Sequence, residues 1–384
     1  MVYRYEQIAP VVFGAGALAT LGEEVKALGC KKVMCVYDGG VKVAGIAEKA
    51  ESSLKEAGIE YIVYDKITPD PPSATVDEAA AIAREAKIDG IVGVGGGSSM
   101  DATKTIALLT DRPGSIRDYL KDPPIWLTSS IPIILVPTTS GTGSEVTQAC
   151  IVSHEELNLK LAVFTRATLA LVDPELVKTL PPEGTAITGF DALAHAVESV
   201  TSNGWNPRSE LLALTAITKI KKYLLRAVKD GSDMEARTEL ALASNWAGTA
   251  FSDTNVHVGH GAADAFSAAF HTPHGLNCAW TTPVTIELVA PVVPEKVKLI
   301  GEAIGVEFGA GDSPEVIGKK TADALRSFMK ECGLQSPTEM GLDRQKTIDS
   351  ANVIMGGGLR FFCPVEITDD ISTWIMTQAY DTYV

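Results

Sequence analysis

Hydrophobic and polar positions alternate in blocks along the first half of the chain. Short apolar runs, KKVMCVYD, EYIVYDK, DGIVGVGGG and PIILVPTT, are bounded by charged residues, glycine or proline. Stretches with helical periodicity separate them, such as residues 45–57 and VDEAAAIAREAKI. Apolar runs of this length that alternate with helices are typical of a parallel sheet with both faces covered. The run LALVDPELV extends the predicted strands to about Val172.

The pattern changes after LPPEGTAITG. Long alanine- and leucine-rich stretches follow, such as DALAHAVESV and SELLALTAITKIKKYLLRAVKDG, with almost no β-branched runs. This sequence pattern predicts helices without strands. A chain of 384 residues is longer than domains with a single hydrophobic core usually are, so two domains are expected. We predict an α/β domain over residues 1–180 and an all-helical domain over residues 181–384.

Composition and charge narrow the class of partner. The hydrophobic fraction of 46% and the charged fraction of 21% are typical of a globular protein. The net charge of −15 argues against nucleic acid or an anionic membrane as a partner, since both select basic surfaces. The sequence shows no secretory signal pattern and no apolar run near the ~20 residues that span a bilayer. The six cysteines contain no CxxC pair and are interpreted as buried thiols, so we expect a cytoplasmic protein.

Two glycine- and hydroxyl-rich loops follow predicted strands. GVGGGSSMDATK stands where a strand ends and a helix begins, and PTTSGTGSEVT follows the next strand. Glycines there allow the backbone to approach an anion, and the helix N-terminus offers free N–H groups to a pyrophosphate. The first loop is not a GxGxxG motif, because Ser98 stands at the third position. Either loop alone is compatible with an ordinary turn, but two on successive strand ends favour a shared cofactor site.

Two charged residues fit the same cofactor. Lys160 follows the second loop and can pair with a phosphate or a ribose hydroxyl. Asp38 closes the first clear strand and can accept a hydrogen bond from an adenosine 2′-hydroxyl. That role favours NAD and repels the 2′-phosphate of NADP. The alternative for Asp38 is a capping or turn residue.

Histidines concentrate in one segment of the second half. Four of the six, His257, His260, His271 and His274, lie within residues 251–280. Asp191 and His195 lie four apart on a predicted helix, which places them on one face. One carboxylate and several imidazoles would suit iron(II), zinc, cobalt or nickel. Spacing alone leaves open a helix-surface pair and hydrogen-bonded core histidines, and it does not choose among the four histidines.

The motifs GGGSSMDATK, PTTSGTGSEVT, DALAHAVES and the segment ending FHTPHG together resemble the iron-containing (group III) alcohol dehydrogenase family. The resemblance implies a Rossmann-like domain, an all-helical domain, and NAD(P) and a metal in the cleft between them. The family's metal is usually iron(II), sometimes zinc, and the matching ligand positions are Asp191, His195, His260 and His274. His257 and His271 fall outside that pattern and are assigned supporting roles. The implied cofactor contacts are Asp38, Gly96, Gly97, Ser98, Thr138, Thr139, Thr142 and Lys160.

The resemblance also implies a reaction. The metal stabilises an alkoxide while hydride passes to nicotinamide, which interconverts a small primary alcohol and its aldehyde. The alternatives are a hydroxyacid–oxoacid transhydrogenase, a reductase of a functionalised aldehyde, and a non-catalytic metal- or nucleotide-binding scaffold. The family commonly forms homodimers or larger homo-oligomers.

The sequence departs from the family pattern at two places. Many members carry a histidine four residues after the third ligand position, where this chain has Asp264. An aspartate can relay a proton, and its charge is expected to disfavour anionic substrates. Near the C-terminus, GGGLRFFCPVEITDD replaces an Asn-Pro-Arg-like element, so we expect Phe361 and Phe362 to reshape the pocket wall. Phe251 is a further predicted wall residue.

Overall fold

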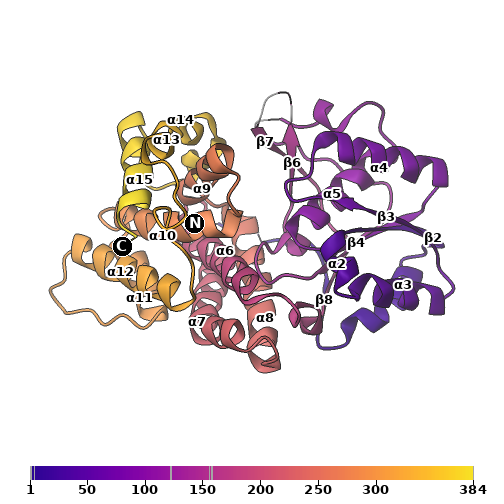
Figure 1. The fold of residues 1–384 in the computed structure, drawn as a ribbon, viewed down its shortest axis with the longest axis horizontal. Coiled ribbons are helices and arrows are strands. Elements are labelled where there is room, and N and C mark those ends of the chain that lie inside the picture. Colours follow the sequence, from indigo (N-terminus) through magenta and orange to yellow (C-terminus); the bar gives the residue numbers. More distant parts are fainter. Residues whose placement is uncertain (1, 4, 122, 155, 157–158, 384) are drawn as a thin grey trace. The chain divides into compact units, whose positions relative to one another are not determined.

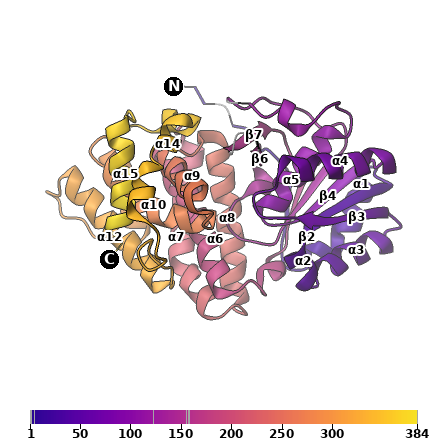
Figure 2. The same cartoon turned by 45° about the horizontal axis from the view of Figure 1, so that its top comes forward.

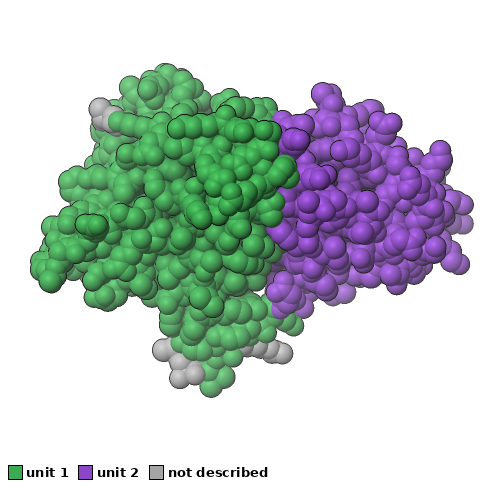
Figure 3. All heavy atoms as spheres, turned by 90° about the horizontal axis from the view of Figure 1, so that it is seen from below, with its two compact units in different colours: residues 1–6, 140–142, 180–384 green, residues 7–139, 143–179 purple. Residues whose placement is uncertain are grey.

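The computed structural model of the protein describes residues 2–3, 5–121, 123–154, 156 and 159–383. Two compact units divide the chain (Figure 3). Residues 7–139 and 143–179 form the α/β unit, and residues 1–6, 140–142 and 180–384 form the helical unit. The short segment 140–142 thus groups with the helical unit, although its neighbours on both sides belong to the α/β unit.

A parallel sheet of six strands forms the centre of the α/β unit (Figure 1). Its strand order is β1-β8-β5-β4-β2-β3, and each neighbouring pair is parallel. The strands are β1 (Val11–Phe13), β2 (Lys32–Asp38), β3 (Glu60–Ile67), β4 (Gly90–Gly95), β5 (Ile133–Pro137) and β8 (Leu169–Val172). The predicted α/β architecture of the first half is confirmed.

Alternate residues of β2 enter two different cores. Val33 and Cys35 belong to one buried cluster, and Met34 and Val36 belong to another. Successive side chains of a strand point to opposite faces, so a strand buried on both faces is apolar at every position. The covering helices are α1 (Leu21–Ala27), α2 (Gly39–Val43), α3 (Ile46–Glu56), α4 (Ser73–Ala86) and α5 (Gly97–Leu109), with the short 3₁₀ segments η1 (Ala17–Thr20), η2 (Ile116–Asp118), η3 (Ser144–Val146) and η4 (Pro174–Val177).

The sequence pattern did not predict an antiparallel hairpin of β6 (Ala149–His154) and β7 (Leu159–Phe164). A buried ion pair attaches it to α5. Lys104 Nζ lies 3.0 Å from Asp101 Oδ1 and donates to the carbonyl oxygen of Ala149 at 2.5 Å. Asp101 Oδ2 accepts the N–H of Ile151 at 3.0 Å. Because buried charges require partners, this network fixes the hairpin on the helix.

The helical unit contains helices α6 to α15, of which α13 and α14 are short (Figure 2). They are α6 (Pro182–Thr201), α7 (Pro207–Lys229), α8 (Met234–Thr254), α9 (Val258–Phe270), α10 (His274–Val289), α11 (Pro294–Ala303), α12 (Pro314–Glu331), α13 (Arg344–Asp349), α14 (Asn352–Gly356) and α15 (Asp369–Asp381), with the 3₁₀ segment η5 (Gly358–Phe362). The predicted all-helical second half is confirmed. Among the described residues, no helix is long and apolar enough to cross a membrane.

Helix α6 is the buried element of this unit. Every residue from Gly189 to Thr201 is buried, and α7, α8 and α10 pack around the helix. A helix that is covered on all sides is expected to be apolar all round. Three ionisable residues, Asp191, His195 and Glu198, interrupt this rule, and each requires a partner in the core.

Candidate functional site

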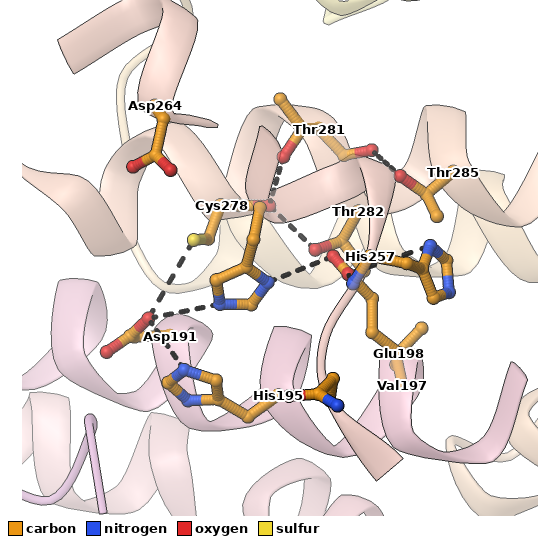
Figure 4. Close-up of polar contacts among 12 residues, drawn as sticks. Asp191, His195, Val197, Glu198, His257, Asp264, Cys278, Thr281, Thr282 and Thr285 are labelled. Atoms are coloured by element: carbon orange, nitrogen blue, oxygen red, sulfur yellow. Dashed lines mark hydrogen bonds and ion pairs between the residues drawn. The ribbon is translucent and has the colours of Figure 1, made fainter. Parts of the chain in front are cut away.

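A single stripe of α6 carries the three buried ionisable residues. Asp191, His195 and Glu198 are spaced by four and then three positions, which aligns them on one helix face. This face lies against α9 and α10, which supply two further imidazoles, His260 and His274. Segments that are distant in sequence therefore place five ionisable side chains together inside the helical unit. Figure 4 labels three of them, Asp191, His195 and Glu198.

One carboxylate oxygen lies at nearly the same distance from three imidazoles. Asp191 Oδ1 lies 3.9 Å from His195 Nε2, 3.9 Å from His260 Nε2 and 3.8 Å from His274 Nε2. These separations are too long for hydrogen bonds, which measure roughly 2.7–3.2 Å. Nitrogen and oxygen ligands ~2.1 Å from one ion stand roughly 3–4 Å apart in a tetrahedral site. The distances from Asp191 Oδ1 therefore fit a carboxylate and imidazoles that share one cation.

The hydrogen-bonding state of His260 leads to the same conclusion. Its Nε2 atom is buried and, among the described residues, has no hydrogen-bond partner. An unpaired nitrogen in a core is costly, so its orientation indicates a missing partner such as a metal ion. Its ring lies 4.6 Å from that of His195, which in turn stacks on Phe251 of α8 with ring centroids 4.3 Å apart. These ring contacts hold both imidazoles in place.

The negative charge of Asp191 favours a cation at the site. Burial opposes ionisation of Asp191, but His195, His274 and His260 hold the pKa of its carboxyl below the ordinary range. Burial lowers the pKa of His195 to about 4, although Asp191 opposes this shift. Asp191 is therefore anionic and His195 neutral near pH 7, the forms that bind a metal, whereas the pKa values of His260 and His274 are raised and both would release a proton on binding.

Glu198 orients the ring of His260 through a contact with its Nδ1 atom. Its Oε1 accepts a hydrogen bond from His260 Nδ1 at 3.0 Å, which leaves Nε2 free to face Asp191. Its Oε2 accepts the backbone N–H of His257, and His257 Nε2 lies 2.8 Å from Thr201 Oγ1. Burial opposes ionisation of Glu198, but His257 and His260 lower its pKa to about 2. A carboxylate that fixes the ring of a ligating histidine is a frequent feature of metal sites.

Sequence reasoning missed this glutamate. Its position seven residues after Asp191, on the same stripe of α6, is the signal that would have found it. His257 caps the start of α9 and supports Glu198, whereas His271 is exposed at the end of that helix with φ 55°.

Two glycines allow the three helices to approach closely. A Cβ atom at Gly259 would lie 2.2 Å from Glu198 Oε1, and one at Gly275 would lie 2.3 Å from the carbonyl oxygen of Ile187. No side chain fits at either position unless the surrounding atoms move. Gly259 directly precedes His260 and Gly275 directly follows His274, so the backbones of α9 and α10 are pressed against α6 where their imidazoles enter the site.

Cys278 also reaches the site and was not predicted. It stands one turn after His274 on α10, is 1% exposed, and places Sγ 3.5 Å from His274 Nε2 and 3.7 Å from Asp191 Oδ1. The sequence interpretation treated all six cysteines as buried thiols because none forms a CxxC pair. The four-residue spacing from His274 was the available signal, the same spacing that linked Asp191 to His195.

The α/β unit presents the predicted cofactor residues at adjacent strand ends. Gly96 caps α5, which begins at Gly97 and continues through Ser98. Asp38, at the end of β2, caps α2 through Oδ1 and accepts from Ser99 Oγ through Oδ2 at 3.1 Å. The capping alternative for Asp38 is thus present in the structure, and it does not exclude a ribose contact.

The loop after β5 supplies the predicted threonines. The N–H of Thr138 donates to the carbonyl oxygen of Gly95 at 2.9 Å, which joins this loop to the preceding one. Thr139 Oγ1 is buried and, within the described part of the chain, lacks a hydrogen-bond partner. Thr142 belongs to the short segment that groups with the helical unit. Lys160 on β7 pairs with Asp70 at 2.7 Å.

Comparisons with known proteins identify the family. Residues 9–174 match the family described as iron-containing alcohol dehydrogenase, and residues 185–379 match the C-terminal part of the Fe-containing alcohol dehydrogenase family. The chain belongs to the iron-containing alcohol dehydrogenase family. The resemblance inferred from the motifs is confirmed, and the protein is an oxidoreductase of this class.

Relatives of this dehydrogenase are named for different alcohols. Choline dehydrogenase of Bacillus subtilis (strain 168) is 32% identical over 99% of this chain and 95% of that protein. Long-chain-alcohol dehydrogenase 1 of Geobacillus thermodenitrificans (strain NG80-2) is 38% identical over 85% of each chain. The crystal structure of 1,3-propanediol oxidoreductase is 32% identical, covers 98% of this chain and 100% of its own, and has a TM-score of 0.92. The relatives support alcohol oxidoreduction, and their names differ in the alcohol.

Asp264, Phe361 and Phe362 were predicted to affect substrate binding. Asp264 lies one turn beyond His260 on α9, with Oδ1 3.8 Å from His274 Nδ1. Phe361 is 70% exposed, and its ring lies 4.7 Å from the Arg360 guanidinium. Phe362 and Cys363 accept hydrogen bonds from Asn203 through their carbonyl oxygens. These contacts place Asp264 beside the metal-site histidines, while Phe361 faces solvent in the helical unit.

Proposed function

We propose that this dehydrogenase interconverts a small primary alcohol and its aldehyde, with NAD as hydride carrier and iron(II) held by Asp191, His195, His260 and His274. The strongest support is the position of Asp191 Oδ1, 3.8–3.9 Å from three imidazole Nε2 atoms. Zinc has the same ligand preferences and is the second candidate. Family membership supports the reaction class, and the ligand set supports the metal.

Each residue of the metal site has a separate task. When bound, the ion supplies Lewis acidity that polarises the substrate oxygen. Asp191 would contribute the negative charge, His195, His260 and His274 would each contribute an imidazole nitrogen, and Glu198 holds the ring of His260. A bound nicotinamide would supply the hydride chemistry, and the protein would orient the reacting groups.

The dinucleotide is proposed to bind at the strand ends of the α/β unit. The N-terminus of α5, at Gly96, Gly97 and Ser98, offers free N–H groups for the pyrophosphate. The hydroxyls of Thr138 and Thr139 lie on the neighbouring loop, and the buried, unpartnered Oγ1 of Thr139 supports a missing partner there. Asp38 is proposed to accept from the adenosine ribose, and Lys160 to contribute a positive charge.

Replacing Asp38 with serine is expected to shift cofactor preference toward NADP. Serine is a good N-cap, so α2 keeps its cap while the charge that repels a 2′-phosphate disappears. Removing one like-charge repulsion of about 1–2 kcal/mol predicts a roughly tenfold rise in kcat/KM with NADP relative to NAD. Asp65→Ser on the adjacent strand β3 is the matched control and should leave the ratio unchanged. An unchanged ratio in Asp38→Ser would remove Asp38 from the cofactor site.

Replacing Asp264 with histidine is expected to improve the use of acidic alcohols. The carboxylate lies 3.8 Å from His274 Nδ1, so a negatively charged substrate bound at the metal would meet a like charge. We expect the KM for a hydroxyacid to fall about tenfold, with little change for a neutral alcohol of the same size. Equal kinetics of variant and wild type with both substrates would refute a role for Asp264 in substrate choice.

Anaerobic loading with iron(II), metal analysis, and a panel of alcohols and aldehydes test the proposal. We expect stoichiometric metal and release of free NADH that depends on alcohol. A hydroxyacid–oxoacid transhydrogenase would retain the cofactor through both half-reactions and release none, whereas a functionalised-aldehyde reductase would respond only to the aldehyde panel. Metal-loaded protein that reacts with no alcohol or aldehyde would overturn the proposal in favour of a non-catalytic scaffold.

A further inference from the structure

The thiol of Cys278 faces the same point in the helical unit as the proposed ligands. Its sulfur points toward Asp191 in Figure 4, and it lies 3.7 Å from Asp191 Oδ1. It also lies 3.5 Å from His274 Nε2. One ligating atom from each of Asp191, His260, His274 and Cys278 lies within 4.8 Å of all the others, and His195 stands outside this group.

These separations match those expected for ligands that share an ion. With a metal–sulfur bond of ~2.3 Å and a metal–nitrogen or metal–oxygen bond of ~2.1 Å, tetrahedral neighbours are about 3.6 Å apart. The sulfur distances of 3.5 and 3.7 Å lie on either side of this value. The corresponding distances between Asp191 and the imidazoles, 3.8 and 3.9 Å, are slightly longer than the ~3.4 Å expected for nitrogen and oxygen donors.

An independent observation shows that this group lacks a partner. His260 is 4% exposed, and its Nε2 atom, one of the group's four donor atoms, has no hydrogen-bond partner among the described residues. Because Glu198 occupies Nδ1, the lone pair of Nε2 remains available to a metal. Cys278 therefore lies beside a nitrogen lone pair that can bind a metal.

We propose that the site contains two overlapping ligand sets. Asp191, His260 and His274 are common to both; His195 completes one set, and the thiolate of Cys278 completes the other. This inference rests on the metal site of the proposed function and adds a ligand to it. Binding of the ion to Sγ releases the thiol proton to solvent.

The two sets differ in charge and softness. With a divalent ion, one carboxylate and three imidazoles leave a net charge of +1, whereas replacing an imidazole by a thiolate leaves the site neutral. Thiolates favour zinc and cobalt over harder ions, while imidazole and carboxylate accept iron(II). The His195 set therefore suits iron(II) with stronger Lewis acidity, and the Cys278 set gives the same pocket a means of retaining zinc.

Cobalt(II) provides a direct test, because cobalt–thiolate bonds give an intense charge-transfer absorption that cobalt–imidazole bonds do not. Cobalt-loaded wild type is expected to show this band, Cys278→Ser to lose it, and the control Cys332→Ser, a buried cysteine of the same unit, to keep it. Bound cobalt should be retained in His195→Ala, where Cys278 completes the set. It should be lost in the double variant His195→Ala/Cys278→Ser.

The outcomes distinguish the two proposals. Wild type that binds cobalt stoichiometrically without the thiolate band overturns the role of Cys278 and leaves the proposed function standing. Wild type that binds no cobalt, iron(II) or zinc overturns the metal site itself. Zinc and iron(II) offered together provide a readout that does not depend on the band: Cys278→Ser should bind less zinc than wild type, and an unchanged ratio of the two metals contradicts the inference. Circular dichroism and thermal melting of each metal-free variant confirm that it is folded.

Discussion

Replacing Asp191 with asparagine should abolish metal binding and lower alcohol oxidation by about 10³-fold. Asp191 Oδ1 is the atom that lies near all three imidazoles, so its charge is the main attraction for a divalent ion. Lewis-acid stabilisation contributes several kcal/mol, and each ~1.4 kcal/mol corresponds to a tenfold change in rate. Metal content and kcat/KM, measured on the same anaerobic preparation, check this result.

Thermal melting separates loss of metal from loss of fold in this variant. Wild type should gain stability with added metal, about 4 kcal/mol when the free ion exceeds its Kd a thousandfold, whereas Asp191→Asn should gain little. Without metal, the variant should be no more stable than wild type, because the three imidazoles hold the pKa of the Asp191 carboxyl below its ordinary range and asparagine loses this favourable interaction. A variant that binds metal with wild-type affinity would show that Asp191 is not a ligand.

Replacing Glu198 with glutamine is expected to weaken metal binding by about 10–100-fold while leaving all four proposed ligands in place. Glu198 accepts hydrogen bonds from His260 Nδ1 and from the backbone N–H of His257. Glutamine has only one acceptor oxygen, so one of these contacts must be lost or must face an amide N–H. A competitive chelator titration measures the change in metal affinity.

Thr201→Val is the matched control for Glu198→Gln. It removes the hydroxyl that contacts His257 Nε2 at 2.8 Å and nearly preserves side-chain volume. His257 supports Glu198 and is not a proposed ligand, so the metal affinity of this variant should change by less than that of Glu198→Gln. Equal affinity in Glu198→Gln and wild type would show that the orientation of His260 does not depend on the carboxylate.

The fold was predictable where the hydrophobic pattern was regular. The run KKVMCVYD became β2, and the amphipathic stretch after Pro72 became α4, because burial on two faces and on one face leave different periodicities. The hairpin β6–β7 was not predicted. Its strands are short, carry charged and polar residues such as Lys160, and are held in place by the buried Lys104–Asp101 pair, which is a tertiary interaction.

The metal site was predictable only in part from spacing. Asp191 and His195 share a helix face, so their proximity follows from sequence separation alone. The choice of His260 and His274 over His257 and His271 came from the family resemblance, since both pairs are fourteen residues apart. The structure separates the two pairs, because it places His260 and His274 near Asp191. His257 contacts Glu198 instead. For Glu198 and Cys278, spacing gives the shared helix face with Asp191 and with His274, and the structure shows that these faces meet.

Gly259 and Gly275 determine the size of the metal site, a property separate from its preference for one ion over another. The ligating side chains decide which ion is preferred, whereas the two glycines decide how near α9 and α10 stand to α6. An added methyl group at either position would press on Glu198 or on the backbone of α6 and would widen the cage without altering a ligand. Protein engineering can therefore address ion chemistry and cage size at separate positions, and a library that varies only the ligands keeps the original cage dimensions.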